Sequence, residues 1–405
     1  MPFLSQNRIF TPLYLTSLFV CFAGYLIPAV FFLYYVGIFG IIIAFLPKIS
    51  ALRVKLNAYD KWLLAFVVFC FMSVFWALNA RVAIGIIWRV ILMSVITVSI
   101  ISSVKDKLAN INDVFKVFLC ASFVFLFYVL IYFDWSSIGE DRLSDTKSGL
   151  NGNGIAGVFV IAIYISCILM SGVKNFLVKS GLFFTICIML FLILMTGSRS
   201  ALFLLILPYS IYLFLKMKRK IYFVFYALCA GFILLYVLFK IPIVYNVLGY
   251  RIEEMVSILN GVEQGDTSRL LLVLYGVEWF QEHPVLGVGI NNYRVLSTVT
   301  APFVGMDFYA HNNFIELLVD VGIVGTILYY SIYVFLIRKS LRIKSDATYF
   351  IAAVLVSFVI YDNFLVSYYE LSSQFVLASC YAVILNKSKT GIISNDKLKG
   401  YKTIQ

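Results

Sequence analysis

The sequence predicts an all-α polytopic membrane protein with about twelve transmembrane helices. Of its 405 residues, 62% are hydrophobic and only 13% are charged, which is about half the charged fraction of an ordinary soluble domain. So much apolar surface does not fit in one globular core, and it forms instead many segments long enough to cross a bilayer. We expect spans near residues 11–28, 29–46, 62–78, 83–103, 115–133, 154–171, 181–197, 200–216, 221–240, 311–337, 348–367 and 369–386.

The basic residues predict the topology of these spans. Residues 11–46 form one long apolar run, and we expect a turn at Pro28 that makes it a helical hairpin. With a cytoplasmic N-terminus, 23 of the 32 Lys and Arg residues then fall in cytoplasmic segments, as the positive-inside rule requires. The bias predicts an even number of spans with both termini in the cytoplasm. The same bias accounts for the net charge of +12: the basic residues orient the chain in a lipid bilayer, and they do not indicate binding to nucleic acid.

Two external segments are longer than a hairpin turn, and segments of this length are usually functional or structured. The first, 134–154, is acidic and rich in Gly, Ser and Asn. The second, 241–310, contains helical patterns at 244–259 and 269–282, and we expect a partly helical cap over the bundle. Asp266-Thr267-Ser268 is the expected cap of the second helix, and His283-Pro284 is its expected end. The chain thus divides into spans one to nine, a large external loop, spans ten to twelve and a cytoplasmic tail, at residues 1–240, 241–310, 311–386 and 387–405.

Three arginines stand in or beside the apolar segments, where charge is costly. Arg199 interrupts two apolar runs, Arg269 begins the capped external helix, and Arg89 lies in the middle of a span. Because a guanidinium donates two parallel hydrogen bonds to phosphate and stays charged, we expect all three to bind an anionic, lipid-borne substrate. The alternatives are lipid headgroups for Arg199 and a salt bridge to Asp266 or Glu263 for Arg269.

His311 is the expected general base. The chain has two histidines, His283 and His311, and both lie in or beside the long external segment. A neutral imidazole accepts a proton near pH 7, which suits activation of a sugar hydroxyl; the alternative role for His311 is a helix cap. Glu316 and Asp320 share a helix face and are candidates for a metal pair or a second base. Because no third ligand has metal spacing, we expect them to hold nearby cations.

Several motifs resemble those of the O-antigen ligase and polymerase superfamily of bacterial membrane glycosyltransferases. They are Thr-Gly-Ser-Arg-Ser-Ala at 196–201, Ser-Arg at 268–269, Glu-Trp-Phe at 278–280, His-Pro-Val-Leu-Gly-Val-Gly at 283–289, and His311-Asn312 with Glu316, Gly322 and Gly325. The motifs cover roughly residues 190–330, and their order and topology together are specific for the superfamily. The N-terminal half is similar only in hydropathy and number of spans.

The resemblance implies a GT-C-type enzyme in the bacterial cytoplasmic membrane that uses no metal, nucleotide sugar or other cofactor. Its donor would be a glycan on undecaprenyl diphosphate, and its acceptor a glycan or glycolipid, with a chain-length regulator as a further candidate partner. Carried over by motif, Arg199 and Arg269 would bind the diphosphate, and His311 would activate the acceptor hydroxyl with inversion at the anomeric carbon. Arg89 is a third candidate ligand. The supporting residues would be Ser198, Asn312 and Glu316.

Two reactions share this machinery. A Wzy-type polymerase transfers the growing chain to the next lipid-linked repeat unit, whereas a ligase transfers the finished chain to lipid A core. The motifs do not separate the two, and we favour the polymerase because such proteins are numerous. A transporter or flippase is the third class. The common six-plus-six transporter plan has its long loop after span six, whereas here the long loop follows span nine.

Overall fold

The computed structural model describes residues 2–50, 56–132, 151–217 and 268–400, with scattered positions between 221 and 245, and side chains for most of these residues. Every regular element within these ranges is helical, and no strand occurs there. The elements are α1 (Pro2–Leu26), η1 (Pro28–Val30), α2 (Phe32–Ser50), α3 (Ala58–Ser73), η2 (Val74–Trp76), α4 (Ala80–Lys105), α5 (Ile111–Tyr132), α6 (Gly152–Gly172), α7 (Phe176–Met195), α8 (Arg199–Lys216), α12 (Ser268–Glu282), α13 (Tyr293–Val299), α14 (Asn313–Ile343), α15 (Asp346–Tyr361) and α16 (Leu371–Gly400).

The helices confirm a polytopic membrane protein. Seven of those in the described residues are long and apolar enough to cross a membrane, and four shorter apolar helices accompany them. These helices coincide with eleven of the predicted spans; the remaining one, at 221–240, lies largely outside the described residues. The 3-10 turn η1 separates α1 from α2 at Pro28, where the hairpin turn was expected. The expected helix at 244–259 and the expected cap at 266–268 also lie outside the described side chains.

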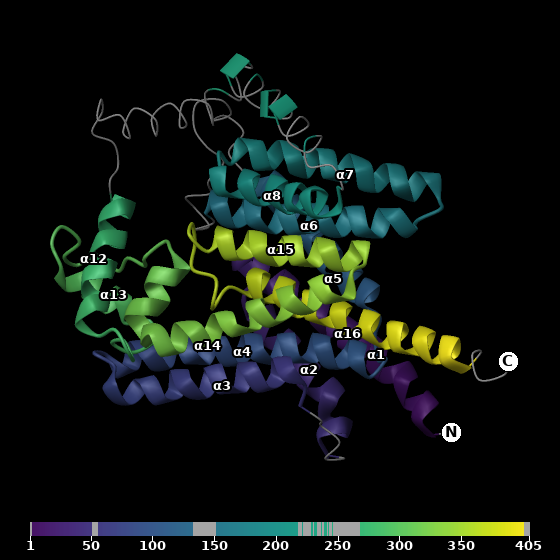
Figure 1. The fold of residues 1–405 in the computed structure, drawn as a ribbon, viewed down its shortest axis with the longest axis horizontal. Coiled ribbons are helices and arrows are strands. Elements are labelled where there is room, and N and C mark those ends of the chain that lie inside the picture. The colour runs from purple at the N-terminus through teal and green to yellow at the C-terminus, as the bar shows by residue number, and fades with distance from the viewer. Residues whose placement is uncertain are drawn as a thin grey trace.

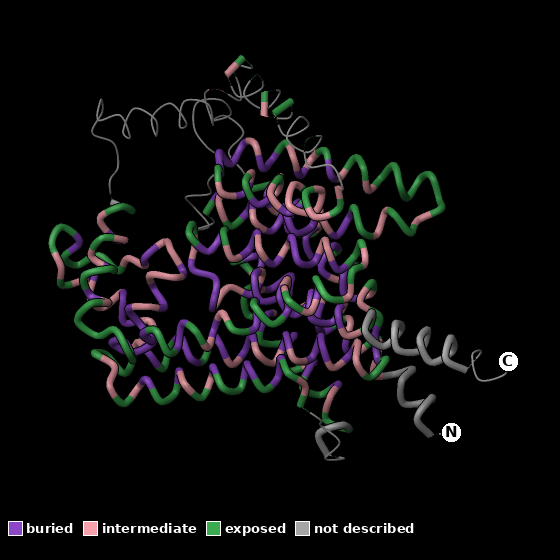
Figure 2. Tube along the Cα trace, in the orientation of Figure 1, coloured by how far each residue is buried: buried purple, intermediate pink, exposed green. Residues whose placement is uncertain are grey.

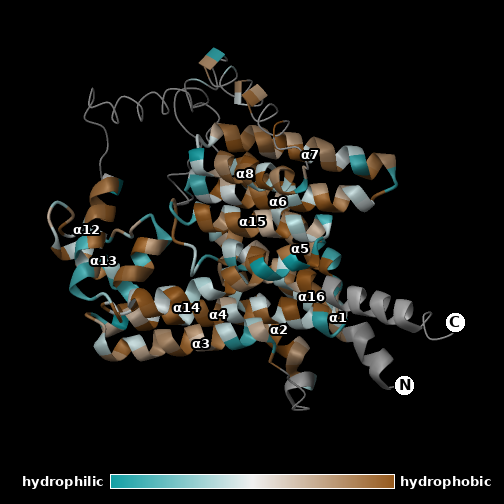
Figure 3. Ribbon diagram, viewed as in Figure 1, coloured by the Kyte–Doolittle hydropathy of each residue, from teal (hydrophilic) through white to brown (hydrophobic). Residues whose placement is uncertain are grey.

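The helices form a bundle with a small appendage at one end (Figure 1). Helices α12 and α13 lie beyond the bundle next to the start of α14, whereas the beginning of α1 and the end of α16 lie at the opposite end. Brown, apolar residues dominate the bundle helices, and polar residues collect near the appendage (Figure 3). The appendage and the two ends of the described chain therefore lie at opposite ends of the bundle.

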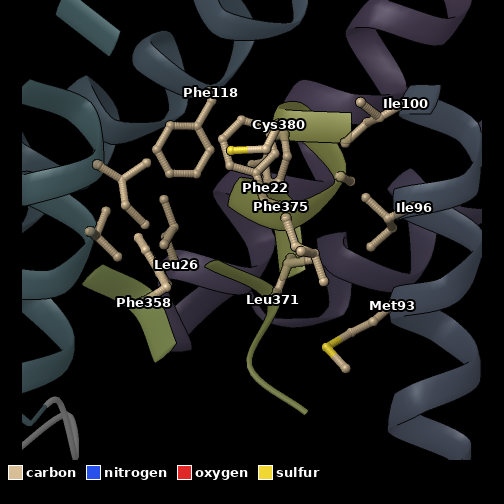
Figure 4. Close-up of a cluster of buried hydrophobic side chains, with 14 of the residues drawn as sticks. Phe22, Leu26, Met93, Ile96, Ile100, Phe118, Phe358, Leu371, Phe375 and Cys380 are labelled. Carbon is tan, nitrogen blue, oxygen red and sulfur yellow. The ribbon is translucent and has the colours of Figure 1, made fainter. Parts of the chain in front are cut away.

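Aromatic packing around α16 forms the centre of the bundle. The rings of Phe118 and Phe375 stack with their centroids 4.4 Å apart, and Phe22 meets Phe375 edge-on at 5.2 Å. Figure 4 shows these rings with Leu371 and Cys380 between helices from both ends of the sequence. Buried residues follow the inner faces of the bundle, while α7 remains largely exposed (Figure 2). Such outward apolar faces suit a lipid environment.

The appendage has a small apolar core of its own, made by α12, α13 and the loops beside them. Its buried members are Leu272, Trp279, Val288, Tyr293, Phe303, Ala310 and Val319. Helix α12 approaches closely because Gly276 has no side chain where it meets Ile315 of α14 and Tyr293 of α13. The helix expected at 269–282 is therefore confirmed, and it packs on the start of α14.

Helix α14 is broken at Gly322, whose backbone is left-handed with φ 65° and ψ −171°. The break leaves two carbonyl groups without helical partners, and the loop after α12 supplies the donors. The N–H of Val288 donates to the carbonyl of Val319 at 2.9 Å, and that of Gly289 donates to Asp320 at 2.8 Å. A side chain at Gly322 would collide with the backbone of this loop, so glycine is required there.

The same loop is fastened to the turn between α3 and α4. The N–H of Ile290 donates to the Ser73 hydroxyl at 3.1 Å, and the Asn292 side chain accepts the N–H of Asn79 at 2.7 Å. Ser73 and Asn292 are both completely buried. Because buried polar groups rarely go without partners, these bonds fix the loop, α13 and the first turns of α14 as one unit.

Candidate functional site

His311 lies directly before the first turn of α14 and has a left-handed backbone, with φ 51°. This conformation is uncommon for a residue with a side chain, although histidine tolerates it better than most. Asn312 and not His311 caps the helix, since its side chain accepts the N–H groups of Phe314 and Ile315 at 3.0 and 3.2 Å. The half-buried imidazole is therefore not used as the helix cap.

Glu316 holds the backbone on the N-terminal side of His311. Its Oε2 accepts the N–H of Ala310 at 2.7 Å, and the side chain is completely buried. Its Oε1 is buried with no hydrogen-bond partner among the described residues. The sequence predicted that Glu316 holds a nearby cation. In the structure its hydrogen-bond partner is a backbone N–H group, and the cation Arg294 interacts with it only electrostatically.

Asn313 holds the backbone on the other side of His311. Its N–H donates to the carbonyl of Asp362 at 2.7 Å, and its side-chain oxygen accepts the N–H groups of Ser367 and Tyr368 at 2.9 and 3.2 Å. Asn313 is completely buried and ties the start of α14 to the loop between α15 and α16. His311 thus stands between two anchored segments, which is how an unfavourable backbone conformation persists.

Asp320, one helical turn beyond Glu316, orients α13. Its two carboxylate oxygens accept the N–H of Asn291 at 2.6 Å and the N–H of Tyr293 at 2.7 Å. Asp320 is completely buried. The next residue after Tyr293 is Arg294, so this carboxylate determines where the Arg294 side chain begins.

Arg294 lies over the ring of Tyr309, with its guanidinium carbon 5.2 Å from the ring centroid. It donates to the Tyr369 hydroxyl at 3.2 Å and forms an ion pair with Asp307 at 3.4 Å. The ring of His311 packs on the same tyrosine, with centroids 3.9 Å apart and planes inclined by 41°. Tyr309 therefore joins a cation and an imidazole, an arrangement worth about 0.5–2 kcal/mol for each contact.

Arg269, at the start of α12, lies within electrostatic range of the same tyrosine. It is exposed at the start of that helix and interacts electrostatically with Tyr309. Burial raises the pKa of Tyr309, although Arg269 and Arg294 both favour its ionised form. His283 follows the far end of α12, and a helix of that length places it roughly 20 Å from Arg269. The sequence grouped the two histidines in one segment, but α12 holds His283 away from His311.

A second carboxylate, Glu370, lies near Arg89 in the loop before α16. The two interact electrostatically, and Glu370 accepts the hydroxyl of Tyr25 at 2.7 Å. Arg89 is exposed on α4 and also acts on Tyr34. Glu370 is therefore a nearby opposite charge for this arginine, and no described contact joins Arg89 to His311 or Arg269.

Arg199 enters the polar end of the bundle on α8. It is the first residue of that helix and is exposed, and Ser198 caps the helix with its buried hydroxyl. The neighbouring Ser200 interacts with Tyr361 at the end of α15, and Tyr361 interacts electrostatically with Glu370. Helices α8 and α15 pack against each other. Arg199 therefore stands at the start of a helix that packs against α15.

The sequence did not identify Arg294, Tyr309 or Glu370 as site residues. In the sequence, Arg294 is one of the basic residues of the expected external loop. Tyr309 and Glu370 stand in segments without a distinctive pattern. Arg294 directly follows Gly-Ile-Asn-Asn-Tyr at 289–293, which continues the glycine-containing motif at 283–289. That position is the sequence feature that could have pointed to Arg294 as a site residue. No local pattern signals that Tyr309 lies between Arg294 and His311.

Residues 184–330 match the family model described as O-antigen ligase. The matched region includes α8, α12, α13 and the first half of α14, and so contains Arg199, Arg269 and His311. The match confirms the resemblance to the O-antigen ligase and polymerase superfamily. No curated protein matches the chain.

Proposed function

We propose, from the place of the chain in the O-antigen ligase and polymerase superfamily, that it is a membrane glycosyltransferase. Its substrates would be oligosaccharide repeat units on undecaprenyl diphosphate, which it polymerises into O-antigen or capsular polysaccharide. The reaction would take place at the outer face of the bacterial cytoplasmic membrane. Members of this family are glycosyltransferase-like enzymes of glycan assembly, and the many apolar helices of the chain suit a donor that is anchored in lipid.

The observation that carries this proposal is the group of side chains around Tyr309. His311 packs on the ring, Arg294 lies over it, and Arg269 interacts with it electrostatically. A proton acceptor and a cation therefore meet at one tyrosine, and a second cation from another segment acts on it electrostatically. Transfer from a lipid diphosphate needs this combination, because the acceptor loses a proton while the leaving group gains negative charge.

In the proposed reaction, an acceptor hydroxyl oxygen attacks the anomeric carbon from the face opposite the diphosphate. The new carbon–oxygen bond forms while the bond between the anomeric carbon and the diphosphate oxygen breaks, so the configuration inverts. The hydroxyl proton passes to the imidazole of His311, and the electron pair of the broken bond stays on the lipid diphosphate. Arg199 and Arg269 would stabilise that charge. Such fixed guanidinium groups can replace a divalent ion, and we expect no metal or other cofactor.

A ligase is the second candidate, since the matched family model is described as O-antigen ligase. A ligase would use the same donor group and the same base, and would differ in passing the finished glycan to lipid A core. The polymerase remains our first candidate because proteins of that kind are numerous and varied.

Deletion of the gene in its native host tests both candidates. Surface glycan and lipid-linked intermediates are separated by size, and the deletion is complemented with the wild type or with His311→Ala. A single repeat unit left on the acceptor indicates a polymerase, whereas full-length chains left on undecaprenyl diphosphate indicate a ligase. An unchanged glycan profile in the deletion strain would overturn the proposed function.

A further inference from the structure

Glu370 differs from the other acidic side chains near His311 in what it is bonded to. Glu316 and Asp320 are completely buried and accept backbone N–H groups. Asp362 is also completely buried and accepts the hydroxyl of Tyr330 at 2.8 Å. These three carboxylates maintain the structure, whereas Glu370 is only half-buried.

Glu370 is nevertheless held in a fixed position. The hydroxyl of Tyr25 donates to its Oε2 at 2.7 Å and accepts the N–H of Leu371 at 3.3 Å. The Tyr25 hydroxyl thus both donates and accepts a hydrogen bond, and a hydrogen bond to a charged acceptor is among the stronger ones. A carboxylate oriented by α1 and by the start of α16 has little freedom to turn away from its site.

The second oxygen of Glu370 is available to a ligand. Oε1 has no hydrogen bond to the described residues, and it is not among their buried unpartnered atoms, unlike Oε1 of Glu316. None of the ion pairs in the described part of the chain includes Glu370. Arg89 is therefore near enough to interact electrostatically without occupying the carboxylate.

Several tyrosines lie near this carboxylate: it directly follows Tyr369, whose hydroxyl accepts a hydrogen bond from Arg294 at 3.2 Å, and Arg294 lies over the ring of Tyr309. Glu370 interacts electrostatically with Tyr309, Tyr361 and Tyr369, and the ring of Tyr309 also packs on His311. Tyr309 and Tyr369 are half-buried. A carboxylate oxygen accepts hydroxyl groups, and tyrosine offers an apolar ring face with a polar hydroxyl. Together these groups suit a sugar.

We propose that Glu370 binds a hydroxyl group of the acceptor sugar through Oε1, in a subsite walled by Tyr25, Tyr309 and Tyr369. A carboxylate repels an anionic diphosphate, so a sugar hydroxyl group is the partner that its charge favours. The subsite is close to Tyr309 and hence to His311, which must reach the attacking hydroxyl. The proposal rests on the proposed glycosyl transfer and adds to it a residue that selects the acceptor.

The test uses the full-length protein in nanodiscs. The donor is the labelled lipid-linked oligosaccharide extracted from the host, and the acceptor is the same oligosaccharide released from its lipid by mild acid. We expect Glu370→Gln to raise the KM for the acceptor about tenfold or more, the loss expected for one hydrogen bond to a charged group. The kcat at saturating acceptor and the binding of farnesyl diphosphate, a soluble probe of the donor site, should stay near wild type.

Two further variants make this result specific. Tyr25→Phe removes the group that orients the carboxylate and should raise the same KM by a smaller factor. Glu282→Gln alters an exposed carboxylate at the far end of α12 and should leave the KM for the acceptor unchanged. If Glu370→Gln does not fold, Tyr25→Phe takes its place. An unchanged acceptor KM, or a loss confined to kcat or to farnesyl diphosphate binding, would overturn the subsite.

A binding measurement separates the subsite from the proposed function. Saturation-transfer NMR of the lipid-free oligosaccharide with the wild type, without donor, needs no turnover. If binding depends on Glu370 but the wild type transfers no glycan, the subsite stands and the proposed function fails. If the wild type transfers glycan but neither binding nor acceptor KM depends on Glu370, the function stands and the subsite is wrong. If neither binding nor transfer occurs, both are wrong.

Discussion

Helix α14 has two polar regions that differ in how their side chains are used. At the break around Gly322, Asp320 is completely buried and the unpaired carbonyls accept N–H groups from the loop after α12. At the first turn, His311 is half-buried and packs against a tyrosine that also faces two arginines. The first region satisfies its polar groups internally, whereas the second leaves ionisable groups accessible.

The comparison shows that polar residues in an apolar chain serve two purposes. The buried set connects α14 to the loops on both sides, because an unsatisfied buried polar group is costly. The accessible set is positioned by the buried one: Glu316 and Asn313 fix the backbone around His311, and Asp320 fixes the helix that carries Arg294. Substitutions in the two sets should therefore give different defects.

The largest effect should come from His311→Ala. Loss of a general base lowers the rate typically 10²–10⁴-fold, so glycan transfer in nanodiscs should fall by about that factor while thermal unfolding stays unchanged. His283→Ala, beyond the far end of α12, is the matched control and should retain wild-type transfer. If His311→Ala transfers glycan at the wild-type rate, His311 is not the general base of the reaction.

Arg269→Ala should be next. One lost donor to a developing negative charge costs about 10²–10³-fold in kcat, and binding of farnesyl diphosphate should weaken as well. Arg81→Ala removes an exposed arginine from the first turn of α4 and provides the control for net charge. Equal losses in both variants would mean that Arg269 acts only through the overall positive potential.

Gly322→Ala tests the buried region. Alanine at a left-handed position costs about 1–3 kcal/mol, and here its side chain would also collide with Val285 and Leu286. We expect a lower unfolding temperature and less protein in the membrane. Gly85→Ala is the control, because Gly85 is helical and has no neighbour within 4 Å. Normal stability of Gly322→Ala would show that the break in α14 tolerates a side chain.

The smallest effect should come from Tyr309. Tyr309→Leu removes the ring between Arg294 and His311, and an aromatic contact worth about 0.5–1.5 kcal/mol corresponds to a loss of roughly 2–10-fold in kcat. Tyr309→Phe keeps the ring and should retain most of the activity. If the phenylalanine variant loses as much as the leucine variant, the hydroxyl and not the ring is what matters.

Hydropathy and basic residues were sufficient to predict the helical bundle, the hairpin at Pro28 and the external helix α12. The reason is that these features depend on local composition. The motifs also singled out His311, Arg199 and Arg269 as candidate site residues, and their roles stay predictions. Arg294 and Glu370 escaped prediction because their partners are distant in sequence: Arg294 meets Tyr369, and Glu370 meets Tyr25 across 345 residues.

The roles of Glu316 and Asp320 show a second limit. Their spacing of four residues correctly indicated a shared helix face, and the nearest charges suggested cations as partners. Their main partners are backbone N–H groups of Ala310, Asn291 and Tyr293. The donors of Asn291 and Tyr293 reach Asp320 because the break at Gly322 brings the loop after α12 alongside the helix, and the donor of Ala310 lies in the segment just before α14. A spacing rule contains no such information.

The bond between Tyr25 and Glu370 has a consequence for biosynthesis. Tyr25 belongs to α1, and its partner follows 345 residues later. At about 5–20 residues per second, roughly 17–70 s pass before the two can meet. A nascent chain that ends before Glu370 therefore has α1 in the membrane without this bond, and the proposed acceptor carboxylate is positioned only after residue 370 has been synthesised.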